Sequence, residues 1–389
     1  MAENRHLSNN ADLQRRLEYL EKRLKEETER RKRAEEARKW EEKAPTRAEQ
    51  ETRPTTFEEL LQLAHELLSR RLQVDTRAEL TRGTIAARRE NVCPEELCHW
   101  SGFPEEMAII FHDVCGFLKP AGETAPRLFH PVDYLKGLFE DVVARPLRSE
   151  FGLCIYEDMA VAKPVANIIR ELSTLPDARV RFRLPDGVRF ERYCARSLEK
   201  EEGAGDDQSD TRLQPYWYWF YRTDDNADCL LTMAELQPPH KLDVQCLRAG
   251  LRDMNFVEEV VKKDTIPTDE DGKMKSSAES RTGATLAQVY NVMIEEGVEF
   301  SYISTGIAYV FLHVPRNEFW KLYYYICEPN ADANRGDAEI DIEKTSIARV
   351  LCFCLMCCRS IVRDQLWRNE AKKRLWTWGE HLDERGEDP

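Results

Sequence analysis

A nearly unbroken apolar run at residues 308–314, Ala-Tyr-Val-Phe-Leu-His-Val, constrains the fold of this chain more than any other segment. Such a run is typical of a strand buried on both faces, because a strand with one solvated face alternates apolar and polar residues. A strand of this kind needs helices on both sides of its sheet. We therefore expect a mixed α/β core that is covered by helices.

Period-two alternation and short aromatic or aliphatic runs predict the remaining strands. Residues 180–192 alternate apolar and polar residues across an Asp186-Gly187 turn, which predicts a hairpin; the apolar positions are Val180, Phe182, Leu184, Val188 and Phe190. Gly306 lies between two predicted strands and is the expected turn of that pair. The other strands are predicted at residues 216–221, 229–236, 298–304, 308–314 and 322–327.

Apolar residues at helical spacing predict the helices that cover this sheet. Thr56 and Glu59 form a capping box that opens one of them, and Gly297 is placed to end another. Residues 77–118 have a mixed pattern that predicts helices with loops, and residues 265–283 are polar and predict a loop. Further helices are predicted at residues 132–144, 156–172, 244–261, 286–297, 347–358 and 364–378.

The beginning of the chain has a different character. Residues 12–53 are almost all Glu, Lys, Arg and Ala, and Leu13, Leu17, Leu20 and Leu24 follow the alternating four-three spacing of a heptad seam. This predicts a long charged helix, and two alternatives stay open for it: a solvated helix, or a coiled coil through which copies of the chain associate. We divide the chain into a charged, partly disordered helix (1–53), a helical region (54–145), an α/β domain (146–380) and a disordered tail (381–389), with an acidic insertion at 199–210.

The composition excludes several classes of protein. A formal net charge of −14 argues against a uniformly basic nucleic-acid-binding surface, although a local basic groove remains compatible with it. No segment reaches the roughly 18 apolar residues of a membrane span, and the first residues lack a secretory apolar region. We therefore expect a cytoplasmic or nuclear protein that makes no membrane contact and whose 12 cysteines are free thiols.

The string Met233-Ala-Glu-Leu-Gln-Pro-Pro-His-Lys241 is the most informative motif for chemistry. PD-(D/E)xK nucleases carry Glu-x-Lys on a strand and an Asp on the neighbouring strand, so that carboxylates hold a divalent metal and the Lys stabilises the transition state. Here Glu235 is present, but Gln237 stands where the motif has Lys, and Pro215-Tyr216 stands where it has Pro-Asp. Two of the three groups are replaced, which predicts a non-catalytic centre.

Other side chains are candidates to replace the missing groups. Glu157, on a predicted helix, would add a carboxylate, and Asp228, like Asp224 and Asp225, lies between two predicted strands. Lys241 lies roughly 13 Å beyond position 237 on an extended chain and would need a bend to act as the cation. Arg248 and Arg252 on the following helix are alternative cations. If the centre is active, Glu235 is the predicted ligand of Mg²⁺ or Mn²⁺; otherwise no cofactor is expected.

The chain resembles a family of fungal proteins in which a charged helix and a helical region precede a PD-(D/E)xK nuclease-like domain. In some members a protein-kinase-like domain follows. The resemblance implies a restriction-endonuclease-like mixed sheet flanked by helices. It rests on Arg53-Pro-Thr-Thr-Phe-Glu-Glu, Pro239-His-Lys-Leu, Leu247-Arg-Ala-Gly-Leu-Arg, Thr265-Ile-Pro-Thr, Thr345-Ser-Ile-Ala-Arg-Val-Leu-Cys and Val289-Tyr-Asn-Val-Met-Ile-Glu-Glu-Gly-Val-Glu-Phe-Ser-Tyr-Ile-Ser-Thr-Gly.

Cysteines and histidines between residues 93 and 115 also suggest zinc, although their spacing matches no standard knuckle and buried thiols explain them better. The candidates are Cys93, Cys98, His99, His112 and Cys115. Three functions follow from the whole sequence. The preferred one is a non-catalytic, nuclease-like interaction module with a protein partner. The alternatives are a metal-dependent nuclease that acts on nucleic acid and a coiled-coil scaffold.

Overall fold

The computed structural model describes ten ranges of the chain and divides it into two units by its internal contacts, residues 1–53 and residues 54–389. In the first unit, residues 22–25 and 27–32 are helical, as is α2 (Arg47–Thr52). Leu24 is 70% exposed, and the other three seam leucines, the insertion at 199–210 and the tail at 381–389 lie outside the described residues. The described ranges are 22–25, 27–32, 47–75, 85, 87–184, 188–194, 216–224, 227–262, 267–334 and 340–379.

The second unit contains a mixed sheet, in which the described residues form eight strands. Strand β4 is parallel to β6 and β1 is parallel to β8, whereas the other neighbours are antiparallel. The mixed α/β class predicted from the sequence is confirmed. In their order across the sheet, the strands are β2 (Val188–Cys194), β3 (Tyr216–Asp224), β4 (Ala227–Leu236), β6 (Phe300–Ser304), β7 (Tyr309–His313), β8 (Lys321–Cys327), β1 (Glu96–His99) and β5 (Met254–Asn255).

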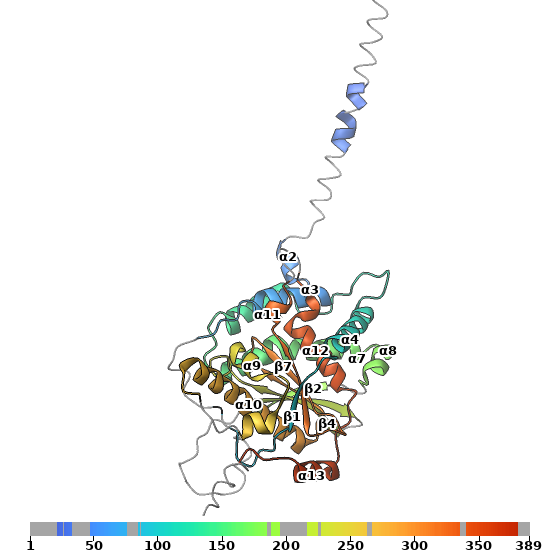
Figure 1. Ribbon diagram of the computed structural model, residues 1–389. Coiled ribbons are helices and arrows are strands. Elements are labelled where there is room, and N and C mark those ends of the chain that lie inside the picture. Colours follow the sequence, from blue (N-terminus) through green and yellow to red (C-terminus); the bar gives the residue numbers. More distant parts are fainter. Residues whose placement is uncertain are drawn as a thin grey trace, which may run out of the picture. The chain divides into compact units, whose positions relative to one another are not determined.

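Helices cover both faces of this sheet and produce two apolar cores. Figure 1 shows α9 and α10 on one side of the strands and α4, α7 and α12 on the other; we call these sides the α10 face and the α12 face. Strand β7 explains why both faces need a cover: Tyr309 and Phe311 belong to the core on the α12 face, and Val310 and Leu312 to the core on the α10 face. The double-sided burial predicted for this strand is confirmed.

On the α12 face, the first helices come from the part of the chain before β2. The capping box predicted at Thr56 and Glu59 is present, with each backbone N–H bonded to the other residue's side chain. These helices are α3 (Phe57–Ala64), η1 (His65–Ser69), α4 (Phe103–Leu118), α5 (Val132–Leu138), η3 (Phe139–Val143), α6 (Glu150–Tyr156), η4 (Glu157–Ala162), α7 (Lys163–Ser173) and α8 (Pro176–Phe182).

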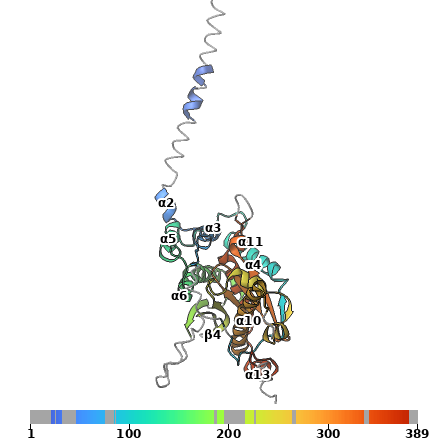
Figure 2. The same ribbon diagram turned by 60° about the vertical axis from the view of Figure 1, so that its left-hand side comes forward.

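The later helices include the most apolar one and the longest one. Every residue of α12 (Ser346–Cys357) is buried, including Arg349, as the strongly apolar character of the segment predicts. On the α10 face, α13 (Gln365–Arg374) packs beside α10 (Glu270–Glu296), as Figure 2 shows from a second direction. The remaining elements are α9 (Val244–Gly250), η6 (Val257–Val261), α11 (Pro329–Asp332) and η7 (Ile342–Lys344).

Two predictions in the first half of the chain are wrong. Residues 180–182 end helix α8 instead of starting a strand: Ala178 and Phe182 are buried one turn apart, whereas Val180 is 81% exposed. The alternation of Val180, Phe182 and Leu184 therefore arose by coincidence within a helical turn. Within 77–118, a strand was missed at β1, because only Leu97 and its two polar neighbours give a periodicity signal there.

Two predictions in the second half are also wrong. Helix α10 begins at Glu270, inside the predicted loop, because the Asp269 side chain caps it and its first turns are polar and exposed. The helix predicted at 244–261 breaks after Gly250, and Met254 and Asn255 pair with β1 as strand β5 before η6 begins. None of the helices that the structure describes combines the length and hydropathy that a membrane span requires.

Two glycines have a positive φ that the fold requires. Gly306 turns the chain between β6 and β7 at φ 78°, and Gly297 ends α10 at φ 71°; both roles are those predicted. A Cβ at Gly297 would lie 2.6 Å from the Arg363 backbone oxygen, and the Arg363 N–H already donates to the Gly297 carbonyl at 2.9 Å. The end of α10 is thereby fixed against the segment that leads into α13.

We expect Gly297→Ala to lower the free energy of unfolding by at least about 2 kcal/mol, because it combines a left-handed backbone with a clash against backbone atoms. Gly116→Ala is the matched control. Gly116 is exposed in α4 with nothing near an added Cβ, so alanine there should stabilise the protein by about 0.5–1 kcal/mol. Urea unfolding of both variants measures this; equal effects would show that Gly297 is not constrained as described.

Candidate functional site

The candidate centre lies at the end of β4, where this strand runs parallel to β6. Glu235 is opposite Ile303, and Leu236 is opposite Ser304. Because side chains alternate along a strand, Glu235 points to the α10 face with Ile303, whereas Leu236 and Ser304 point to the α12 face. Gln237 follows the strand directly, and its N–H donates to the Ser304 carbonyl at 2.9 Å.

Glu235 is fully buried and makes one side-chain hydrogen bond. The amide nitrogen Nε2 of Gln237 donates to Glu235 Oε1 at 2.6 Å, and Glu235 Oε2 is buried without a partner. Burial raises the pKa of Glu235 to about 8, with a contribution from the nearby charge of Glu150, whereas the bond from Gln237 lowers it. At neutral pH this carboxyl is therefore protonated and uncharged.

Lys241 lies on the turn after β4 and forms an ion pair with Glu150, a residue outside the predicted motif. Its Nζ is 2.6 Å from Oε1 of Glu150 at the start of α6, and both side chains are nearly buried at 12% and 11% exposure. The neighbouring His240 has a buried Nδ1 without a partner, and burial lowers its pKa. The bend needed to bring Lys241 back toward the strand is present, but the charge of Lys241 is compensated by Glu150.

Glu157 lies on the other face of the sheet. In η4 it accepts hydrogen bonds from Ser304 Oγ and from the Tyr309 hydroxyl, the latter at 3.1 Å. Its side chain is 2% exposed, and burial raises its pKa to about 7 despite these two bonds. Since Ser304 and Tyr309 belong to the α12 face, the sheet separates Glu157 from Glu235. The structure does not bring these two carboxyls together.

The two predicted positions on the β3–β4 hairpin lie at opposite ends of it. Tyr216 is the backbone partner of Leu236, so it is beside the centre, but its side chain is outside the described residues. Asp228 is seven residues before Glu235 on β4, roughly 23 Å away along an extended strand. It forms an ion pair with Arg189 at 2.9 Å. Asp224 and Asp225 have no described side chain.

The alternative cations on the helix after β4 are paired elsewhere. Arg248 makes two hydrogen bonds to Glu328, at 2.8 and 2.7 Å. Arg252 lies 3.0 Å from Glu259 and 3.2 Å from Glu279. Each of these guanidinium groups therefore has a carboxylate of its own.

The described residues do not fit a divalent metal at Glu235. Mg²⁺ and Mn²⁺ bind several oxygen ligands including ionised carboxylates, whereas the side-chain partner of Glu235 is a neutral amide and the other buried carboxyl, Glu157, lies on the opposite face of the sheet. Within the described ranges, no three His, Cys, Asp or Glu side chains are grouped to hold any metal ion, and this covers the zinc candidates between Cys93 and Cys115.

Sequence reasoning missed Glu150 and Ser304. Glu150 follows Ser149, whose side chain caps α6 by accepting the Gly152 N–H at 3.0 Å, so an acidic residue there indicates only a first helical turn. Ser304 lies in the Ile-Ser-Thr-Gly string before the Gly306 turn, and a polar residue at the end of a buried strand is the one signal that marks it. The partners of these two residues, Lys241 and Glu157, are distant in the sequence, so the pairs could be identified only from the fold.

Comparison with known proteins gives one consistent result. The family model described as "Spore killer 2 N-terminal domain" matches residues 224–373. The chain is also similar to "Meiotic driver SPOK2" of Podospora anserina, with 23% identity over 373 residues that cover 86% of this chain and 47% of the relative. It thus spans about half the length of that relative. No solved structure matches. The predicted likeness to fungal proteins is confirmed in this form, and neither name mentions a nuclease.

The raised pKa of Glu235 predicts how stability depends on pH. The folded protein keeps a proton on this carboxyl up to about pH 8, whereas the unfolded chain releases it near 4.5, so stability falls as pH rises between these values. Glu235→Gln imitates the protonated form. The free energy of unfolding of the variant minus that of wild type should therefore be at least about 1 kcal/mol larger at pH 8 than at pH 5.

The measurement is urea unfolding of wild type and variant at pH 5, 6, 7 and 8. Exposed Glu123→Gln is the control and should leave the pH profile unchanged. A smaller but substantial slope will remain in Glu235→Gln up to about pH 7, because the pKa of Glu157 is raised in the same direction. If wild type and Glu235→Gln have parallel pH profiles, Glu235 is ionised in the folded protein.

Proposed function

We propose that this chain is a nuclease-like, non-catalytic module of a fungal spore-killer-type protein, and that it acts by binding another protein. The similarity to a meiotic driver supports the spore-killer part of this proposal. The nuclease-like part is supported by the resemblance of Glu235-Leu-Gln237 to Glu-x-Lys. It is also supported by the pairing of β4 with β3, because the motif places its Asp on the neighbouring strand and Tyr216 occupies that position here.

The observation that carries the non-catalytic part is the hydrogen bond between Gln237 and Glu235. A lysine at position 237 would place a positive charge beside Glu235 and hold it ionised, whereas the Gln237 amide supplies a hydrogen bond that lowers the pKa less than burial raises it, and Oε2 stays buried without a partner. Loss of one preorganised electrostatic contact costs about 10²–10³-fold in rate, and here the metal-binding carboxylate on β3 is replaced as well. An uncharged centre neither binds a divalent cation nor orients a hydroxide toward a phosphate.

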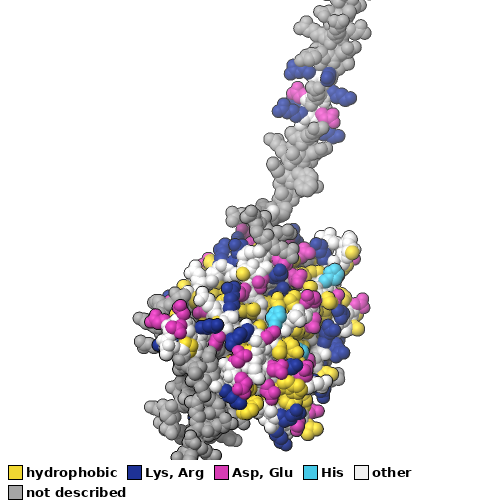
Figure 3. Space-filling model, viewed as in Figure 1, with side chains coloured by type: hydrophobic (Ala, Val, Ile, Leu, Met, Phe, Trp, Pro, Cys, Tyr) yellow, Lys and Arg dark blue, Asp and Glu magenta, His cyan; other side chains and the backbone are white. Residues whose placement is uncertain are grey.

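The surface favours a protein partner over nucleic acid. On the face shown in Figure 3, Lys and Arg side chains are interspersed with Asp and Glu. Ion pairs such as Arg248 with Glu328 and Lys372 with Glu295 occur among the described residues. Nucleic-acid binding usually requires a continuous basic stripe that contacts several phosphates. The mixed charge and the net charge of −14 instead fit the polar rim of a protein interface.

The charged helix at the start of the chain is a separate proposal. Its described part carries Arg31 and Glu27 as an i,i+4 pair 3.9 Å apart, and Leu24 of the heptad seam is exposed. An exposed leucine on a helical seam supports association with a second helix, and we propose that copies of the chain assemble there. The alternative, a solvated helix, predicts the same number of copies per particle with and without residues 1–50.

The decisive test is Mn²⁺-dependent cleavage of single- and double-stranded DNA and RNA by the full chain. We expect no cleavage above the metal-only blank from wild type, and none from Gln237→Lys, because restoring the cation does not restore the second carboxylate. An active Mn²⁺-dependent nuclease run on the same substrates is the positive control, and circular dichroism checks that both proteins are folded.

Glu235→Ala and exposed Glu123→Ala form the matched pair for this assay. Cleavage by wild type that survives in Glu123→Ala and disappears in Glu235→Ala would establish a nuclease with a rearranged centre and overturn the proposal. Cleavage that persists in both variants would come from a contaminant or from another site. Binding of Mn²⁺ by wild type in the micromolar range, measured by calorimetry, would likewise contradict the neutral centre.

A further inference from the structure

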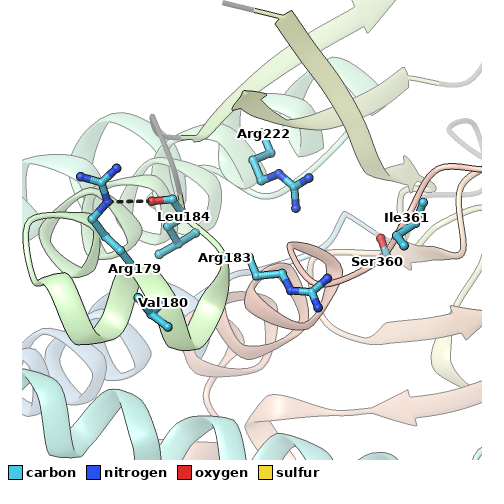
Figure 4. Close-up of a pocket in the computed structure, with 7 residues that line it drawn as sticks. All are labelled: Arg179, Val180, Arg183, Leu184, Arg222, Ser360 and Ile361. Carbon is cyan, nitrogen blue, oxygen red and sulfur yellow. Dashed lines mark hydrogen bonds between the residues drawn. The ribbon is translucent and has the colours of Figure 1, made fainter. Parts of the chain in front are cut away.

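Two adjoining pockets lie between α4, the end of α8 and the loop that follows α12. One has a volume of about 510 Å³ and the other of about 450 Å³, and Ser360 lines both. Figure 4 shows the smaller pocket, in which Val180 on α8 and Ile361 on the loop lie on different sides. We call the two pockets together the α4–α8 groove. Among the described residues that line it, none was predicted for the Glu235 centre.

The larger pocket has an apolar floor that belongs to the protein core. Ile110 of α4, Phe300 of β6 and Met356 of α12 line it, and all three are buried. Strand β6 pairs with β4 on one side and with β7 on the other, so the backbone hydrogen bonds of the strand beneath the pocket are already used. A ligand here meets packed side chains and no free strand edge of β6.

Three branched apolar side chains border the groove and are exposed to solvent. Ile109 is 57% exposed, Val180 is 81% exposed and Ile361 is 67% exposed. Single exposed apolar residues are common on protein surfaces, but these three surround two joined pockets. A ligand that covers them removes apolar surface from water, which stabilises the complex.

The fold itself does not require apolar residues at the two helical positions. In α4 the buried side is formed by residues such as Ile110 and Val114, and Ile109 lies beside it; in α8 Phe182 is buried and Val180 is not. Exposed Ile and Val are poorer helix formers than Ala or Leu, because branching at Cβ restricts their rotamers. Ile109 and Val180 therefore indicate a surface that a partner covers.

Two carboxylates at the larger pocket define one charge of that partner. Glu106 lines the pocket and is exposed in α4, and Glu299 lines it from the start of β6. Glu299 is half-buried and is 3.1 Å from Nε2 of His313. Carboxylates beside an apolar floor suit a Lys or Arg side chain, because its methylene stem packs on the floor while its cation reaches the carboxylates.

The basic residues of the same pocket exclude a uniformly charged ligand. Arg181 is compensated by Asp113, 2.6 Å away, and Arg359 is exposed at the pocket. A nucleic acid would meet the two carboxylates, and a polycation would meet Arg359. Mixed charge around an apolar floor instead matches a protein segment whose apolar residues are flanked by charges of both signs.

The walls of the groove favour a helical segment over an extended one. The helices α4 and α8 satisfy most of their own backbone groups, and β6 is paired on both sides, so these walls offer an extended segment little to pair with. A helix satisfies its backbone internally. It also presents side chains at positions i, i+3, i+4 and i+7 as a row that fills successive pockets.

We propose that the α4–α8 groove binds an amphipathic helix of a partner protein. Aliphatic side chains of that helix fill the two pockets and cover Ile109, Val180 and Ile361, and a Lys or Arg beside them pairs with Glu106 or Glu299. The proposal rests on the proposed function, since it names the surface by which the chain binds another protein. It uses no property of the Glu235 centre, so metal-dependent cleavage would overturn the non-catalytic part of that function and leave the groove as it is.

The test begins with selection of ligands by the full chain from a displayed library of helical peptides. The peptides are alanine-based, about 16 residues long and randomised along one face, because shorter isolated helices are marginal in water. We expect the enriched peptides to carry Leu, Ile or Val at i, i+3 or i+4, and i+7, with a Lys or Arg next to them. No enrichment, or enrichment of peptides without the apolar row, would overturn the proposal.

Matched variants then place the best labelled peptide by fluorescence anisotropy. Ile109→Asp should weaken binding about tenfold or more, because it puts a charge where an apolar side chain is covered. Leu366→Asp makes the same change at an exposed residue of α13 and should bind as wild type does. Glu106→Lys should weaken binding about twofold to fivefold, and Glu105→Lys, its neighbour in the same helical turn, should have a smaller effect.

Two further measurements separate the remaining alternatives. A peptide with two central prolines should not compete, because proline breaks the helix, and equal competition would overturn the helical ligand. Equal affinity of Ile109→Asp and Leu366→Asp would place the peptide elsewhere, which overturns the groove and leaves a protein-binding function. Sedimentation velocity of the full chain tests a second copy as the occupant: association lost in Ile109→Asp but kept in Leu366→Asp would contradict a partner protein. Circular dichroism checks that each variant is folded.

Discussion

The parallel pairing of β4 with β6 is the contact on which the arrangement of this protein depends. It joins a hairpin of β3 and β4 to the pair β6 and β7, across the long helix α10, and it requires apolar cover on both faces. Its register also sorts the polar side chains. Glu235 opposite Ile303 faces α10, and Ser304 opposite Leu236 faces α12. Glu157, which bonds to Ser304, and Glu235 therefore lie on opposite sides of the sheet, although both were predicted for one centre. A shift of one residue would exchange these faces and bury the wrong side chains.

The buried carboxyls of Glu157 and Glu235 have different hydrogen-bond partners. Glu157 accepts hydrogen bonds from Ser304 and Tyr309, whereas Glu235 has the Gln237 amide and one oxygen without a partner. The pKa of Glu157 is correspondingly raised less, to about 7, than that of Glu235, to about 8. Both favour the protonated form when the protein is folded, because desolvation outweighs the bonds. A chain that used Glu235 as a metal ligand would need the opposite balance, with cations close to the carboxylate.

The apolar pattern was sufficient for the parts of the fold that are buried on all sides. The segments at 308–314 and 347–358 needed no context, because only a strand buried on both faces and a helix buried all round suit those sequences. Sequence reasoning failed where exposure removed the signal. The start of α10 is a solvated helix that reads as a loop, and β1 is too short for a period. At the site, the motif predicted the adjacency of Glu235 and Gln237, which share a face two residues apart. The pairing of Lys241 with Glu150 depends on a loop and a helix start that are 91 residues apart, and no periodicity encodes it.

The contrast between the buried and the exposed polar groups of the protein explains why binding is the stronger functional inference. At the Glu235 centre the carboxyl is buried, its pKa is raised to about 8, and the neighbouring Lys241 and Glu150 neutralise each other. A buried neutral carboxyl beside an amide has little to offer a ligand. The exposed face, in contrast, carries Lys and Arg interspersed with Asp and Glu, a composition that suits the polar rim of a protein interface better than a polyanion. If the chain is a nuclease-like module, as we propose, recognition of a partner therefore uses its surface and not the end of β4.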